Sequence, residues 1–280
     1  LTIERALHET AFYKENYGKM SVPVLRAANY LDHCQKKAIY IGEGELIVGE
    51  RGPKPKCVPT FPELTCHSVE DLNVLNTREL QRYTISQEDI DTYAQEVIPY
   101  WAGRTQRERI FSHVPQEWRL AYEAGMFTEF MEQRAPGHTA LDGKIYTKGM
   151  LDYKREIATN LAALDYLNDP EATDKAEEWK AMDISCDAVI VLAERHADLA
   201  EEMAKTEADP KRKAELLQIA EVCRWVPANA PRNFWEAIQM YWFCHLAIIT
   251  ELNGWDAMNP GHFDQHLTPF YELELAAGTL

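Results

Sequence analysis

The longest apolar-leaning stretch of this chain is AIQMYWFCHLAIIT at positions 237–250, and it contains both a glutamine and a histidine. It is too short to cross the hydrocarbon core of a bilayer, which requires about 20 apolar residues in a helix. We therefore expect a buried core helix over 231–252. Hydrophobic residues make up 46% and charged residues 26% of the 280 positions, as in soluble globular proteins that bury a core. A chain of this length forms one large domain or two ordinary ones.

The net charge is strongly negative, at −16 with a sequence pI near 5.0. Such a chain repels the phosphates of nucleic acids and the headgroups of anionic membranes, so neither is an expected partner. The first residues lack the basic, apolar and small-residue order of a secretory signal. Six cysteines show no disulfide-framework spacing and no CxxC pair, which predicts reduced thiols in a cytoplasmic protein.

Apolar residues recur at helical spacing through most of the chain, which predicts a mostly α-helical protein with a few short strands. ELIVGE (45–50) is short, β-branched and flanked by glycines, so we expect a strand there. Residues 51–67 contain four prolines and predict an extended connection. Ser86 with Asp89 three positions later is a helix-start signature. Helices are expected within 3–38, from 86, and over 115–125, 148–167, 174–208, 209–226 and 231–252, with a final helix after the turn-rich residues 252–268; the helix over 174–208 would turn inward Met182, Cys186, Val189, Ile190, Ala193 and Ala197.

Two Gly/Pro-containing polar segments interrupt this pattern, at 126–148 and 252–268. The first holds RAPGHT with His138, which can exchange a proton near neutral pH. The second holds NGWDAMNPG with Asp256, whose pKa the neighbouring Trp255 could raise. Together these side chains could hydrogen-bond a substrate hydroxyl and help it leave as water. The alternative is a surface turn and a capping aspartate.

Other short motifs indicate less. GEGELIVGE lacks the context of a phosphate-binding loop. HFDQH (262–266) spaces two histidines like helical zinc ligands, but Phe263 stands where a metalloprotease carries its glutamate, so no metal is expected. The pairs His33–Cys34 and Cys66–His67 would form a mixed site only if folding brought them together.

Several longer motifs resemble the N-terminal third of glycyl radical enzymes of the pyruvate formate-lyase-like family. They are ELIVGE with PTFPEL, EWRLAYEAGMFTEFMEQRAPGHT, YTKGMLDYKREI, IQMYWFCHLAIITELN and PGHFDQHLTPFY, and they run in order over nearly the whole chain. The similarity is greatest to the eliminase branch, which includes dehydratases and sulfite-lyases.

This resemblance implies that residues 1–280 are the N-terminal part of a ten-stranded α/β barrel wrapped by helices, in a protein nearly three times as long. The glycine that stores the radical and the cysteine that becomes the thiyl radical would both lie outside these 280 residues, so this chain alone should not catalyse. The radical would be installed after translation by a radical S-adenosylmethionine activating enzyme, with no bound cofactor. The resemblance also implies an anaerobic homodimer acting on a small molecule.

By motif, the resemblance places His138 and Asp256 beside the departing hydroxyl and Arg134 where it could bind an anionic substrate. It implies a lyase that removes water from a small hydroxylated substrate such as 4-hydroxyproline. In isethionate lyases the position matching His138 is a glutamine, so His138 favours dehydration. Two alternatives stay open: a C–S lyase that releases sulfite from dihydroxypropanesulfonate or isethionate, and a non-catalytic helical binding or scaffold domain.

Overall fold

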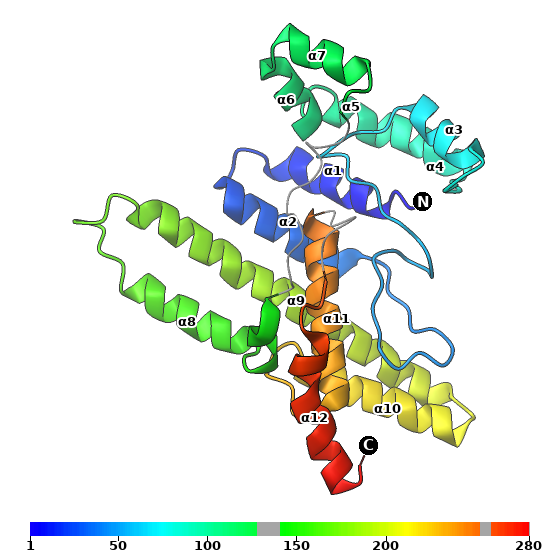
Figure 1. Ribbon diagram of the computed structural model, residues 1–280, viewed down its shortest axis with the longest axis vertical. Coiled ribbons are helices and arrows are strands. Elements are labelled where there is room, and N and C mark those ends of the chain that lie inside the picture. The colour runs from blue at the N-terminus through cyan, green and yellow to red at the C-terminus, as the bar shows by residue number, and fades with distance from the viewer. Residues whose placement is uncertain (128–140, 253–258, 280) are drawn as a thin grey trace.

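The computed structural model describes residues 1–127, 141–252 and 259–279, and these residues are mainly helical (Figure 1). The mostly α-helical fold class expected from periodicity is confirmed. In chain order the helices are α1 (Glu4–Asn16), α2 (Val22–Lys36), α3 (Val69–Thr77), α4 (Gln87–Thr92), the π-helix η1 (Tyr93–Val97), α5 (Ile98–Trp101), α6 (Gln106–His113), α7 (Gln116–Glu123), the 3-10 helix η2 (Asp142–Tyr146), α8 (Met150–Ala162), α9 (Ala172–Thr206), α10 (Pro210–Trp225), α11 (Phe234–Leu252) and α12 (Phe263–Ala277).

The 35-residue helix α9 is the longest element, and α2, α8 and α10 pack against it (Figure 1). Its inward face is rich in alanine, which lets the neighbouring helices approach closely. Cys186 and Val189 are buried as expected, but Met182 is 51% exposed. At that turn the buried position is the adjacent Ala181, because a long helix drifts relative to a fixed seven-residue spacing. The buried face of α9 includes Ala188, Val189, Leu192, Ala193, Ala197 and Ala200.

Helix α11 crosses α9 and α10 and lies in the core, as its apolar sequence predicts (Figure 1). Ala237, Met240 and Phe243 on this helix are fully buried. Helix α12 packs against α11, with the rings of Phe263 and Tyr241 centred 5.3 Å apart.

The strand expected at 45–50 is wrong, because this segment runs against a helix. Gln239, fully buried on α11, accepts a hydrogen bond from the Val48 amide at 2.8 Å and donates one to the Val48 carbonyl at 2.9 Å. The indoles of Trp235 and Trp242 donate to the carbonyls of Leu46 and Gly49. These side chains satisfy the backbone groups that a neighbouring strand would otherwise pair.

Residues 51–67 form a non-helical connection, as the prolines predict, but bends and turns interrupt the expected extended course. One isolated bridge joins Thr2 to Pro59. Among the described residues, no pair of strands forms a ladder longer than a single bridge. Ser86 caps α4 by accepting a hydrogen bond from the Asp89 amide, which confirms the predicted start of that helix. Helices α1 and α3 to α5 share a separate small core that includes Leu72, Ile90 and Tyr93.

Replacing Gln239 with methionine should destabilise the protein by roughly 2–6 kcal/mol, because two buried backbone groups of Val48 lose their partners at about 1–3 kcal/mol each. Gln35→Met, at an exposed position inside α2, is the matched control and should change stability by less than about 0.5 kcal/mol. Urea unfolding of both variants measures the difference. Equal midpoints for the two would show that Gln239 does not hold this segment.

Candidate functional site

The three side chains that the sequence places at the site lie outside the described residues. Arg134 and His138 fall within 128–140, and Asp256 falls within 253–258. Their roles therefore stay predictions. The structure does describe the residues to which both segments attach, namely Phe127 and Leu141 for the first, and Leu252 at the end of α11 and Asn259 for the second.

The C-terminal end of α11, which leads directly into 253–258, is held by a buried arginine from the start of the chain. Arg5 on α1 donates from Nε to the Thr250 carbonyl at 2.9 Å. Its two terminal nitrogens donate to both carboxylate oxygens of Glu63, at 3.1 and 3.0 Å. Arg26 on α2 binds Glu251 through Nε at 3.0 Å. Thr250 and Glu251 are thus fixed six and five positions before Asp256.

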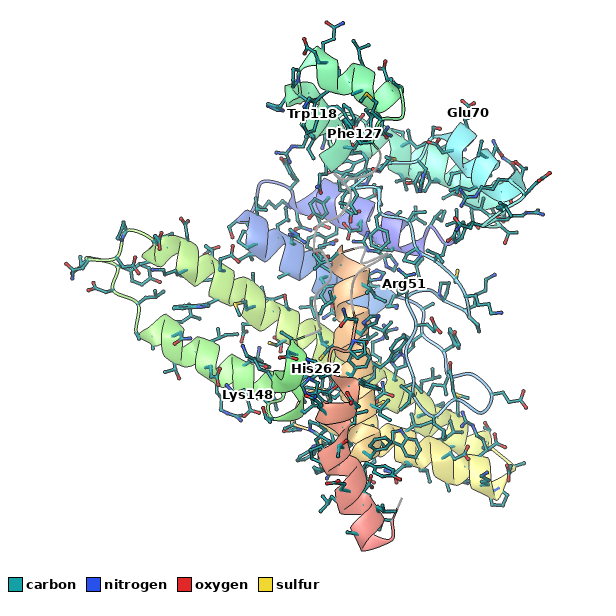
Figure 2. All side chains as sticks on the ribbon, viewed as in Figure 1. Arg51, Glu70, Trp118, Phe127, Lys148 and His262 are labelled. Carbon is teal, nitrogen blue, oxygen red and sulfur yellow. The ribbon has the colours of Figure 1, made fainter. Side chains whose placement is uncertain are left out.

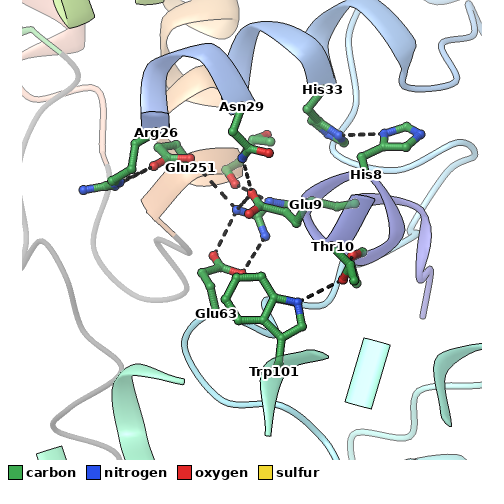
Figure 3. A network of polar contacts seen from close by, with 12 residues as sticks. His8, Glu9, Thr10, Arg26, Asn29, His33, Glu63, Trp101 and Glu251 are labelled. Carbon is green, nitrogen blue, oxygen red and sulfur yellow. Dashed lines mark hydrogen bonds and ion pairs between the residues drawn. The ribbon is translucent and has the colours of Figure 1, made fainter. Parts of the chain in front are cut away.

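We call Arg5, Arg26, Glu9, Glu63, Glu251 and Asn29 the Arg5 cluster; Figure 3 shows its carboxylates converging from different parts of the chain. Glu9 lies 2.8 Å from Arg5 and Glu251 lies 4.0 Å from it. Burial alone would lower the pKa of Arg5, but Glu63 and Glu9 outweigh that effect and raise it. The guanidinium therefore stays charged in the interior.

Three carboxylates share two guanidiniums in the Arg5 cluster, so its charge balances when one carboxyl holds a proton. Glu9 is the most deeply buried of the three, with a side chain 4% exposed. Burial raises its pKa to about 8, although Arg5 acts in the opposite direction. Asn29 donates to its Oε1 at 2.7 Å, and the same oxygen lies 2.8 Å from the Arg5 guanidinium, so the proton belongs on Oε2.

Aromatic side chains extend the Arg5 cluster into the surrounding helices. The Arg5 guanidinium lies 4.3 Å from the centre of the Phe61 ring, a cation–π contact with the proline-rich connection. The indole of Trp101 on α5 donates to Thr10 on α1 at 2.9 Å (Figure 3). The Arg5 cluster therefore fixes α1, α2, the connection and the end of α11 relative to one another, and the Trp101 bond joins α5 to α1.

At the other segment, residue 127 ends an aromatic cluster. The Phe127 ring lies 5.4 Å from Trp118 and 6.0 Å from Tyr122, both on α7 (Figure 2). Arg107 donates to the Tyr122 hydroxyl at 2.8 Å. Segment 128–140 therefore starts from a packed point on the α6–α7 unit.

The two histidines of HFDQH do not share a helix face. His262 is exposed at the N-cap position of α12. His266 belongs to the first turn of that helix, and its Nε2 lies 3.1 Å from Asp142 Oδ1. Cys66 contacts Tyr93, and His33 faces His8, so the two Cys/His pairs have different surroundings. In the ranges that the structure covers, no three His, Cys, Asp or Glu side chains converge as metal ligands would.

All six cysteines are free thiols, as predicted. Burial raises the pKa of Cys34 and Cys186 to about 11 and of Cys223 and Cys244 to about 12. These four thiols stay protonated near neutral pH and are structural core residues.

The Arg5 cluster was not predicted from the sequence. Arg5 and Glu9 at i, i+4 on a helix are a visible signal for an ion pair. Nothing in the sequence links that pair to Glu63 or to Glu251, because those contacts form only in the folded chain.

Comparison with known proteins decides the family. The whole chain, residues 1–280, matches the family described as Pyruvate formate lyase-like. The chain belongs to the pyruvate formate lyase-like family. Trans-4-hydroxy-L-proline dehydratase of Clostridioides difficile is 47% identical over 280 residues, which are all of this chain and 36% of that protein. Isethionate sulfite-lyase of Desulfovibrio desulfuricans is 33% identical, over all of this chain and 35% of that protein.

Solved structures agree with this membership. Hydroxyproline dehydratase of Clostridioides difficile, with trans-4-hydroxy-L-proline bound, superposes on the whole chain with a TM-score of 0.95 at 47% identity. A structure from work on 1,2-propanediol dehydration in Roseburia inulinivorans gives 0.91 at 30% identity and covers 99% of this chain. The chain spans 35% of each of these structures, about a third of their length. Among the described residues, no helix of this family member is both long and apolar enough to cross a membrane.

Replacing Arg5 with methionine should cost roughly 3–5 kcal/mol of stability, because it leaves buried carboxylates without their cation. Glu9→Gln keeps the shape and hydrogen-bond acceptor of a protonated glutamate and should stay within about 1 kcal/mol of the natural protein at pH 5. Urea unfolding measures both. A larger loss for Glu9→Gln than for Arg5→Met would contradict this charge assignment.

The stability of the natural protein relative to Glu9→Gln should depend on pH. A carboxyl whose folded pKa is raised from about 4.5 to about 8 contributes stability below pH 4.5 and loses it as the pH rises to 8. Unfolding measured from pH 4.5 to 8.5 should therefore shift steadily in favour of the variant. Glu15→Gln, at an exposed position on the same helix, is the control. Parallel curves for the natural protein and Glu9→Gln would mean that Glu9 is ionised in the folded state.

Proposed function

We propose that this chain is part of a glycyl radical lyase that eliminates water from a small hydroxylated substrate, with trans-4-hydroxy-L-proline as the leading candidate. The observation that carries the proposal is the 47% identity to trans-4-hydroxy-L-proline dehydratase over the entire chain. Isethionate sulfite-lyase and the propanediol structure reach only 33% and 30%. The activity belongs to the full-length protein, since this chain spans about a third of such enzymes.

In this proposal His138 and Asp256 manage the leaving hydroxyl. When a carbon next to C–OH loses a hydrogen atom, the hydroxyl needs a proton to depart as water. A base must then take up the proton that the remaining substrate radical cation loses. His138 supplies the proton and Asp256 hydrogen-bonds the same hydroxyl, which are roles suited to general acid–base catalysis. Arg134, on the same turn as His138, would bind the substrate carboxylate.

The proposal also includes what lies beyond these residues. The thiyl cysteine and the glycyl radical would come from the rest of the protein, within the α/β barrel implied by the family resemblance. A radical S-adenosylmethionine enzyme would install the radical, under anaerobic conditions and in the cytoplasm. We expect the full-length protein to be a homodimer.

Cleavage of a C–S bond is the second candidate, because isethionate sulfite-lyase matches the whole chain at 33% identity. Activated full-length protein should dehydrate trans-4-hydroxy-L-proline and release no sulfite from isethionate or dihydroxypropanesulfonate. Mass spectrometry and a sulfite assay separate these reactions. Sulfite release without dehydration would replace the first proposal by the second.

His138→Gln in the full-length protein should lower the turnover number by about 100-fold or more, because the leaving hydroxyl loses its proton donor. The glycyl radical doublet in electron paramagnetic resonance should keep its intensity, since His138 takes no part in installing the radical. His113→Gln, at an exposed position on α6, is the matched control. Unchanged turnover would remove His138 from the mechanism. If no glycyl radical forms in the natural protein after activation, the non-catalytic scaffold alternative gains support.

A further inference from the structure

The chain emerges from segment 128–140 in an unusual backbone conformation. Leu141 and Asp142 both have positive φ angles, of 59° and 51°. Leucine is disfavoured in this left-handed region, and two successive non-glycine residues there are rarer still. Such backbone persists only where surrounding contacts determine it, and it is concentrated at functional sites.

Those contacts come from His266 on α12. Asp142 Oδ1 lies 3.1 Å from His266 Nε2, and the ring of Tyr146 stacks on the His266 ring at 5.3 Å with an interplanar angle of 27°. Gly143 lets the ring approach, because a Cβ at that position would lie 3.1 Å from His266 Cε1. The His266 ring therefore packs against one turn of η2 through a hydrogen bond, ring stacking and close packing.

Both partners of this pair are anchored on their far sides. After η2, the amides of Met150 and Leu151 donate to the carbonyls of Pro227 and Ala228, at 2.8 and 2.9 Å. Gly149 packs there so closely that a Cβ would lie 2.3 Å from the Ala228 carbonyl oxygen. Helix α12 is fixed by its buried Leu267 in the core that it shares with η2 and α11.

The contact between Asp142 and His266 itself stabilises little. The Asp142 side chain is 65% exposed and the His266 side chain 20%, and exposed pairs contribute little to stability. Its value is geometric, because it joins two points that are 124 positions apart in the chain. One point lies four residues after His138 and the other ten residues after Asp256.

We propose that Asp142 and His266 are positioning residues, because their contact fixes relative to one another the described residues that follow the segments carrying His138 and Asp256. This inference rests on the proposed function and deepens it, because elimination needs both groups at the same hydroxyl. A small misplacement caused by a distant substitution can lower a rate by one to two orders of magnitude. The pair therefore affects catalysis without touching the substrate.

The test uses the activated full-length protein and trans-4-hydroxy-L-proline. Asp142→Ala removes the hydrogen-bond acceptor, and His266→Phe keeps the stacking on Tyr146 but removes the bond to Asp142. Each should lower kcat by about tenfold, with KM within about twofold and the glycyl radical signal unchanged. The double variant should be no slower than either single variant, because the two residues act as one unit.

Two control variants make the result specific. Asp142→Asn keeps an oxygen that accepts from His266 and tolerates the left-handed region, so it should retain at least half of the natural kcat. His262→Gln changes the exposed histidine of the same HFDQH motif and should leave kcat unaltered. Loss of activity in Asp142→Asn equal to that in Asp142→Ala would overturn the hydrogen-bond argument.

Natural turnover in Asp142→Ala and His266→Phe, together with a slow His138→Gln, would overturn the positioning role and leave the proposed function intact. A slow Asp142→Ala with an unimpaired His138→Gln would remove His138 from the reaction and would overturn the inference that the pair acts by positioning His138. If no substrate turns over, hydrogen exchange decides. Asp142→Ala should then speed amide exchange in 259–270 and His266→Phe in 141–149, whereas unchanged exchange in both would reject the pair.

Discussion

The buried guanidinium of Arg5 is the constraint on which the placement of the other elements depends. It enters the interior at the beginning of the chain and binds Glu63 in the proline-rich connection and the Thr250 carbonyl at the end of α11. A charge at this depth is tolerated only when its partners stand in the correct geometry. Segments 58 and 245 positions apart from Arg5 in the sequence must therefore meet at one point.

A buried ion cluster is weak evidence for stability but good evidence for geometry. An apolar replacement of the same volume can be as stable, yet it would allow small sliding movements between packed surfaces. Hydrogen bonds from Arg5 to a carbonyl and a carboxylate fix distance and direction together. For a helix end that leads into a proposed reacting group, we infer that direction matters more than the net energy of the contact.

Helix α11 shows why part of this arrangement could be predicted from the sequence. The apolar run of α11, the cap at Ser86 of α4 and the prolines of 51–67 are all local signals. Each of these elements follows from the conformational preferences of its own residues. ELIVGE has the composition of a strand, but its partner is the amide side chain of Gln239 rather than another strand. A β-type pattern predicts an extended, half-buried backbone. It does not predict which group will form hydrogen bonds with that backbone.

The candidate site divides in the same way. Periodicity alone identified two interruptions in a helical chain, and only the family resemblance gave His138 and Asp256 their proposed roles. The Arg5 cluster and the Asp142–His266 pair could not be derived from the sequence, since each joins residues that the chain separates widely. In the sequence, nothing next to Arg5 or Asp142 indicates which distant residue each of them contacts.

These two contacts lie on either side of segment 253–258. Glu251 is held by Arg26 and Arg5 before it, and His266 is held by Asp142 after it. Binding and catalytic groups in loops are positioned by the rigid elements from which the loops extend. The two contacts differ in burial, and so in what their loss would do. We therefore expect loss of the deeply buried Arg5 to lower the stability of the fold, and loss of the more exposed Asp142–His266 contact to leave a folded protein.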